Sequence, residues 1–206
     1  MIDLTQTIVH GMDVFPGEQT PSLLRDNLPP TAGYVTHRLE SNMHTGTHID
    51  APFHVKADER TIDSFAVELF CGKACVIDVR GKEKVSMQAE WTALFSKFPI
   101  VLFCTGHDVH WGFPDYYGNY PEFDDAVASA LKENGVRIAG FDSPSPDKTP
   151  FRFHSIFLSG DRFMIENLSG LTSLLNATEV EFFAFPLKVK AEASLIRAVA
   201  RYGSIQ

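Results

Sequence analysis

Short apolar runs alternate with amphipathic stretches through the middle of the chain. Residues 74–79 and 99–104 are brief runs rich in β-branched and aromatic side chains, a composition typical of buried strands. Between them, residues 86–98 carry apolar side chains at helical spacing, namely Met87, Trp91, Leu94, Phe95 and Phe98. The pattern therefore predicts a strand, a helix and a second strand in succession.

The same rhythm recurs further along the chain. Residues 123–134 predict a helix that begins near Asp124 and ends before Gly135, and residues 136–141 predict the strand that follows it. Strands that alternate with helices favour an α/β fold with a parallel or mixed central sheet.

The two ends of the chain read as strands and loops. The first forty residues mix apolar runs with turn-forming residues and end in an alternating stretch, 34–40, that predicts a strand. Near the other end, residues 180–189 and 194–202 predict two strands of a hairpin joined by the link 190–193.

Length and charge narrow the class of protein. A chain of 206 residues can bury a sizeable core, so we expect a single domain over residues 1–206. The net charge of −8 is unsuited to nucleic acid or an anionic membrane surface, which leaves a small molecule as the expected partner. The sequence shows no apolar run long enough for a membrane span and no leader, so we expect a cytoplasmic protein.

The cysteines carry no evident chemistry. Cys71, Cys75 and Cys104 are an odd number, and their spacing fits neither a redox motif nor a zinc ribbon. We interpret them as reduced, buried residues.

The most informative segment is 44–54, which contains three of the eight histidines and one aspartate. Gly46, Pro52 and the β-branched residues between them disfavour a helix, so the segment is strand or loop. If its backbone is extended, the side chains of His44, His48, Asp50 and His54 share one parity and project to one face, where they could converge on an ion.

Imidazoles and a carboxylate form a mixed nitrogen and oxygen donor set. Such a set suits Zn²⁺, Mn²⁺ or Fe²⁺ better than Mg²⁺ or Ca²⁺. Because structural zinc sites are usually closed and rich in thiolate, a set without cysteine favours catalysis. The alternative is that these are surface or capping histidines and a turn aspartate that share no ion.

The pattern His44-x-Gly46-Thr47-His48-x-Asp50-Ala51-Pro52-x-His54 resembles the signature of the cyclase-like metal hydrolases, the family of bacterial kynurenine formamidase and isatin hydrolase. The resemblance extends over nearly the whole chain, through segments 15–18, 140–145, 166–168, 185–189 and 197–199. It implies a β/β/α, swivelling-type fold with a mixed sheet and a homo-oligomer, a dimer or larger.

The resemblance also implies the roles of individual residues. His44 and His48 would bind a first metal, Asp50 would bridge it to a second, and His154 with Glu166 would complete the second site. His54 would then be the catalytic acid/base residue. The cofactors would be two divalent ions per chain, Zn²⁺ or Mn²⁺. Taken alone, His154 would be interpreted as a structural histidine and Glu166 as a solvated carboxylate.

The implied activity is hydrolysis of a C–N amide bond by metal-activated hydroxide, with N-formylkynurenine as the leading substrate. Bacterial formamidases tend to carry Trp where this chain has Phe15. Phe15 is therefore expected to stack on the substrate ring more weakly than Trp would, or else to be a core anchor. A cyclic amide such as isatin, or a lactone, is an alternative substrate. A protein that binds a metal or small ligand without chemistry is the alternative from another class.

The loop 105–113 mixes aromatic and polar groups after a predicted strand and is a candidate pocket wall. The sequence leaves three roles open for its His107 and His110, namely extra metal ligands, pocket residues or surface histidines. It also leaves open whether Tyr116, Tyr117 and Tyr120 line a pocket or lie on the surface.

Overall fold

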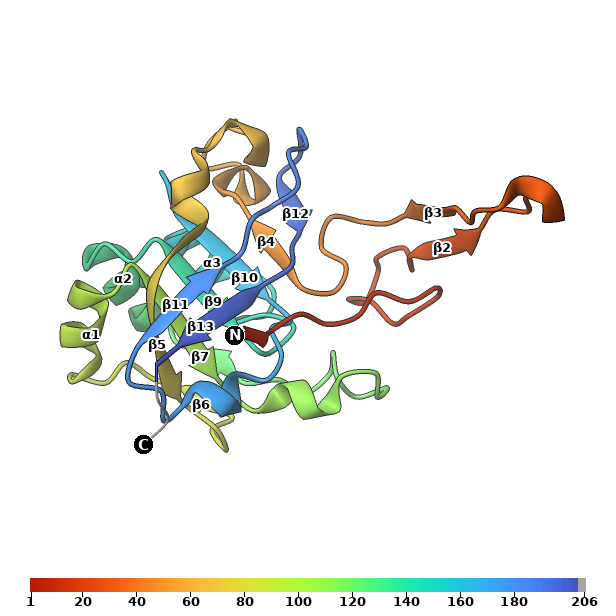
Figure 1. Ribbon diagram of the computed structural model, residues 1–206. Coiled ribbons are helices and arrows are strands. Elements are labelled where there is room, and N and C mark those ends of the chain that lie inside the picture. The colour runs from red at the N-terminus through yellow and green to blue at the C-terminus, as the bar shows by residue number, and fades with distance from the viewer. Residues whose placement is uncertain (204–206) are drawn as a thin grey trace.

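The computed structural model describes residues 1–203, in which a mixed β-sheet carries helices on one face (Figure 1). The helices are α1 (Trp91–Lys97), α2 (Asp125–Glu133) and α3 (Arg152–Phe157). The strands are β1 (Ile2–Asp3), β2 (Ser22–Arg25), β3 (His37–Glu40), β4 (His48–Asp50), β5 (Cys71–Asp78), β6 (Lys84–Val85), β7 (Ile100–Cys104), β8 (Glu122–Phe123), β9 (Ile138–Phe141), β10 (Phe163–Glu166), β11 (Val180–Phe183), β12 (Ala193–Leu195) and β13 (Val199–Tyr202).

The main sheet confirms the predicted α/β class with a mixed sheet. Its strand order in the described residues is β1-β13-β11-β5-β7-β9-β10-β4-β12. The central strands β5, β7, β9 and β10 run parallel, and antiparallel strands flank them on both sides. Among residues 1–203, no helix combines the length and apolarity that crossing a membrane requires.

Alternation along the central strands divides the core into two layers. On β7, Ile100 and Leu102 face one cluster, whereas Val101 and Phe103 face the other. The second cluster contains buried residues from all three helices. Trp91 comes from α1, Leu131 from α2 and Phe157 from α3. Because successive side chains of a strand point to opposite faces, a fully apolar strand such as β7 must be covered on both sides.

Helix boundaries differ modestly from those predicted. The helix expected over 86–98 is the shorter α1. Residues 89–90 form a turn before it, in which the N–H of Trp91 donates to the carbonyl of Gln88. The helix expected over 123–134 is α2, which begins after Asp124 as predicted, while Phe123 belongs to β8. The Asp124 side chain bonds the Ser86 hydroxyl and pairs with Lys84, so it anchors β6 to the start of α2.

The predicted C-terminal hairpin is confirmed as an antiparallel pair, but its strands are shorter than predicted. Val180 lies opposite Tyr202 and Phe183 opposite Val199, and a bridge pairs Pro186 with Ile196. The expected strand 180–189 ends at Phe183, and the expected strand 194–202 is divided into β12 and β13. The division arises because β12 pairs with β4 at its other edge, which draws the hairpin tip toward the histidine segment.

An N-terminal arm, residues 19–41, projects from the body of the protein (Figure 1). It contains β2 and β3, which within residues 1–203 pair only with each other. The strand expected over 34–40 begins at His37. All four residues of β3 are exposed. Its alternating pattern therefore marks a solvent-exposed ribbon and not a strand of the core.

Gly140 lies at the most crowded glycine position of the sheet. A methyl group there would approach Leu102 to 2.7 Å and Leu168 to 2.9 Å. We expect Gly140→Ala to lower the free energy of unfolding by about 1–3 kcal/mol, because overpacking a well-packed core forces neighbours off their rotamers. Urea unfolding measures this. Gly118→Ala, where the nearest atom lies at 3.4 Å, is the control, and equal stabilities of the two variants would contradict the expectation.

Candidate metal centre

The histidine segment bends and is not extended throughout. Only His48 and Asp50 lie on a strand, β4, whereas His44 lies in the preceding loop and His54 in a 3₁₀ helix, Pro52–Val55. Gly46 at φ 64° provides one bend, and Pro52 begins the helix that forms the other. The common-parity argument is therefore wrong as geometry, although the predicted convergence is found. The ring centroids of His44 and His48 lie 5.0 Å apart, and those of His44 and His54 lie 4.4 Å apart.

Asp50 is the shared member of two groups of potential metal ligands. His44, His48 and Asp50 form the first group, and Asp50, His54 and His154 form the second, each with donor atoms within 4.8 Å of one another. Nδ1 of His44 lies 2.9 Å from Oδ1 of Asp50, and Nε2 of His48 lies 3.6 Å from the same oxygen. A carboxylate between two sets of imidazoles has the position of a bridging ligand.

Glu166 reaches the same centre from β10. It lies directly opposite His48 in the antiparallel register of β10 and β4. Its two oxygens lie 3.4 Å from Nε2 of His48 and 3.4 Å from Nε2 of His154, which α3 supplies. The structure thus brings all six residues expected at the metal centre together, namely His44, His48, Asp50, His54, His154 and Glu166.

Unsatisfied buried atoms show that these side chains fit a divalent ion. Nε2 of His48, both carboxylate oxygens of Asp50 and Oε1 of Glu166 are buried and make no hydrogen bond to the described residues. Buried polar atoms without a partner are costly and rare in native proteins. Their convergence, and the mixed nitrogen and oxygen chemistry, match a divalent metal ion.

Three of the imidazoles are oriented through their other ring nitrogen. Nδ1 of His48 lies 2.9 Å from the carbonyl oxygen of Gly46, and Nδ1 of His154 lies 2.6 Å from Oδ1 of Asp147. Nε2 of His44 lies 3.2 Å from Oε1 of Glu192. Such outer contacts fix the tautomer and ring orientation of metal-binding histidines. Sequence reasoning missed Asp147 and Glu192, because neither lies in a pattern that predicts a ligand.

The electrostatics of the centre favour bound cations. Burial lowers the pKa of His44, but the negative charge of Asp50 and of other nearby carboxylates outweighs this effect and raises that pKa to about 11. Burial likewise lowers the pKa of His154, and Asp147 and Glu166 raise it to about 10. The negative field that holds protons on these imidazoles also attracts a divalent ion, which would displace those protons on binding.

A cavity of about 430 Å³ opens beside the centre. Its aromatic wall consists of Phe15, Tyr117 and Phe151, with Phe15 at centroid distances of 6.1 Å and 6.5 Å from the other two. Phe15 therefore lies in the cavity wall, and its predicted stacking on a substrate ring stays a prediction. Glu18 also lines this cavity, although sequence reasoning gave it no role.

Of the other aromatic and histidine candidates, some are buried and hydrogen-bonded to neighbouring residues and others are exposed. His107 is buried with Nε2 2.7 Å from the Tyr116 carbonyl oxygen, and the Tyr116 hydroxyl donates to Asn167. His110 is exposed, and Tyr120 bonds the carbonyl of Asp147. Of the candidates in loop 105–120, only Tyr117 lines the cavity beside the metal centre.

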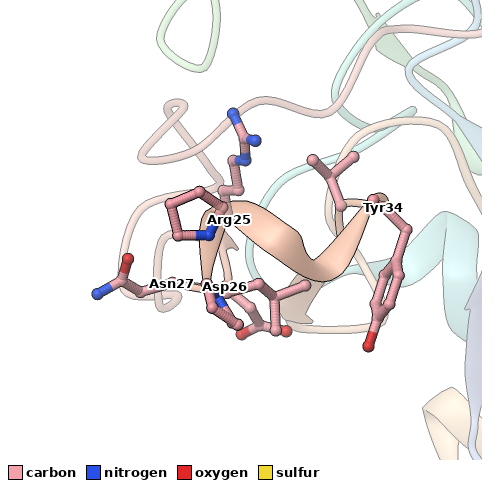
Figure 2. Close-up of a pocket in the computed structure, with 9 residues that line it drawn as sticks. Arg25, Asp26, Asn27 and Tyr34 are labelled. Carbon is pink, nitrogen blue, oxygen red and sulfur yellow. The ribbon is translucent and has the colours of Figure 1, made fainter.

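A larger hollow of about 720 Å³ lies on the N-terminal arm (Figure 2). Figure 2 shows Arg25, Asp26, Asn27 and Tyr34 around it, beside the short helix at the arm's tip. None of the residues that line it belongs to the metal centre. Its size therefore does not make it a candidate active site.

Known proteins resemble this chain along its length. The family model named Cyclase matches residues 2–148. A kynurenine formamidase of Bacillus cereus is 30% identical, over 97% of this chain and 96% of its own. An isatin hydrolase A of Labrenzia aggregata, bound to benzyl benzoate, superimposes with a TM-score of 0.79 at 20% identity, covering 97% of this chain and 92% of that one. An isatin hydrolase bound to the product analogue thioisatinate gives a TM-score of 0.83 at 18% identity, covering 97% and 90%.

Proposed function

The chain belongs to the cyclase family, and from this premise we propose that it is a metal-dependent amidohydrolase, most similar in activity to an arylformamidase. N-formylkynurenine, cleaved to kynurenine and formate, is the proposed substrate. The observation that carries the proposal is the position of Asp50 between two ligand groups at the wall of an aromatic cavity. The 30% identity to a kynurenine formamidase supports the choice of substrate.

The proposed cofactors are two divalent ions, Zn²⁺ or Mn²⁺, within one domain formed by residues 1–206. His44 and His48 would hold the first ion, His154 and Glu166 the second, and Asp50 both. When bound, such ions activate water and stabilise developing negative charge on a carbonyl oxygen. A buried, carboxylate-rich centre without cysteine supports this assignment.

The chain's own residues would position the substrate and move protons. Phe15 would stack on the aryl ring, with Tyr117 and Phe151 completing the wall. An aryl amine leaves poorly as an anion, so a neighbouring acid must protonate its nitrogen. His54 is the proposed acid/base residue, because its ring lies 4.4 Å from that of His44 and 5.8 Å from that of His154, at the exposed side of the centre.

Ring-opening hydrolysis of a cyclic amide such as isatin is the second candidate. The fold shared with isatin hydrolases favours it, and the same residues would perform it. A purely ligand-binding role requires a closed centre. The open cavity beside these ligands favours hydrolysis over that role.

We also propose that the chain forms a homo-oligomer, at least a dimer, through its N-terminal arm. The arm exposes large apolar side chains that the body of the same chain does not cover, namely Leu24, Tyr34, Val35 and Leu39. Exposed apolar groups gathered on one element are typical of protein interfaces.

Removal of metal tests the proposed activity. We expect purified protein to contain about two metal ions per chain and to hydrolyse N-formylkynurenine, as two-ion centres of this kind do. Chelation should abolish turnover, and added Zn²⁺ or Mn²⁺ should restore it. Elemental analysis and a kynurenine absorbance assay measure both quantities. Metal without turnover would direct the search to isatin, whereas protein that takes up no metal would refute the proposal.

A further inference from the structure

The Phe-Pro-Gly-Glu turn places an aromatic ring and a carboxylate on the same wall of the cavity. The N–H of Glu18 donates to the Phe15 carbonyl over 3.0 Å, with Pro16 and Gly17 between them and Gly17 at φ 97°. This is the arrangement of a type II turn, for which proline and glycine are the favoured central residues. The turn fixes Phe15 and Glu18 relative to each other, and both line the cavity.

One oxygen of the Glu18 carboxylate has no donor within the described part of the chain. Its Oε2 atom is buried and makes no hydrogen bond to any residue of 1–203. Burial raises the pKa of Glu18, and this pKa stays above its usual value although the nearby charges of His44 and His48 act to lower it. A buried carboxylate oxygen that has lost water without gaining a donor is costly, so this half-buried side chain has an acceptor atom that a bound molecule could satisfy.

No residue of the cavity wall donates to Oε2 of Glu18 in the part of the chain that the structure describes. The wall includes neither lysine nor arginine, and its hydroxyl, amide and imidazole groups make no hydrogen bond to this atom. Glu18 belongs to neither group of three potential metal ligands, although it lines the same cavity as His44 and His48. A donor on a bound molecule whose ring lies against Phe15 could reach the same oxygen, because both residues line the cavity.

We propose that Glu18 accepts a hydrogen bond from the N–H of the substrate and thereby selects aryl amides that carry an N–H over lactones and N-alkyl amides of the same shape. This inference rests on the proposed function and decides between substrates that the metal centre alone would treat alike. Sites built to bond a substrate N–H discriminate strongly, because an analogue without it leaves the buried acceptor unpaired.

Isatin and N-methylisatin form a matched pair for the test, since they differ only in whether the ring nitrogen carries hydrogen or methyl. We would measure Kd and kcat/KM for both compounds with metal-loaded wild type, Glu18→Leu and Glu18→Gln. Wild type should prefer isatin, and Glu18→Leu should lower that preference by about 10- to 100-fold, the range for an unpaired buried acceptor. Glu18→Gln, which keeps an acceptor oxygen of the same reach, should retain most of it.

The methyl group's own steric effect is present in every variant, so the change in preference isolates the N–H contact. An unchanged preference in Glu18→Leu overturns the inference, as does loss of bound metal from that variant, which would make Glu18 a support of the metal centre. Equal binding of both compounds by wild type also overturns it. If wild type hydrolyses neither isatin nor N-formylkynurenine but binds isatin in a Glu18-dependent way, the proposed function fails and the inference on Glu18 stands.

Discussion

Asp50→Asn is expected to lower kcat/KM by more than about 100-fold, because replacing even an outer contact of a metal site costs about 10- to 100-fold. Asp50 belongs to both ligand groups, and both its oxygens are buried without a hydrogen-bond partner in the described residues. Asparagine keeps the size of the side chain but removes its charge and one of its two acceptor oxygens. We therefore expect both ions to bind more weakly in this variant.

Elemental analysis after dialysis against a weak chelator, together with turnover, measures the effect of Asp50→Asn. The matched control is Asp161→Asn, which removes an exposed carboxylate 2.9 Å from Arg60 and should change neither quantity. Retention of both ions by Asp50→Asn would contradict a bridging role. Loss of one ion only would assign Asp50 to a single group.

His54→Ala is expected to lower kcat by about 10²- to 10⁴-fold, the usual contribution of a positioned acid/base group, while the bound metal is retained. His54 lies on the exposed side of the centre, where it can exchange protons with solvent. The geometry also offers a competing role, because His54 lies in a ligand group with Asp50 and His154. Metal content separates the two roles, since a ligand's removal releases metal and an acid/base residue's removal does not.

The pH profile gives His54→Ala a second readout. Burial is the main cause that lowers the pKa of His54 below its usual 6.5. The neutral form, which can accept a proton before donating it to the leaving nitrogen, is then present at neutral pH. We therefore expect kcat/KM to fall only as the pH drops below 6.5. This acidic limb should be absent in His54→Ala and unchanged in His110→Ala, which removes an exposed histidine outside the cavity. Full turnover in His54→Ala would refute the acid/base role.

Local patterns in the sequence determined the elements whose contacts are local. The apolar runs before and after α1 predict β5 and β7 because buried strands of a parallel sheet must be apolar on both faces. The segment 44–54 predicts a metal centre because its donors lie within a few residues of one another, whatever the exact path of the backbone. The alternation in 34–40 predicts a strand but not whether it is buried, since a ribbon that projects from the body has the same period as a core strand.

Only the tertiary structure decided which distant residues complete the centre. Glu166 faces His48 through the register of β10 and β4, and Glu192 reaches His44 across 148 positions because β12 joins the other edge of β4. Glu18 faces the cavity through a turn far from the signature. The sequence by itself determined the donor types and the strand-helix order, which depend on local spacing. Convergence of the outer carboxylates depends on strand pairing and packing over the whole chain, and no local spacing encodes that.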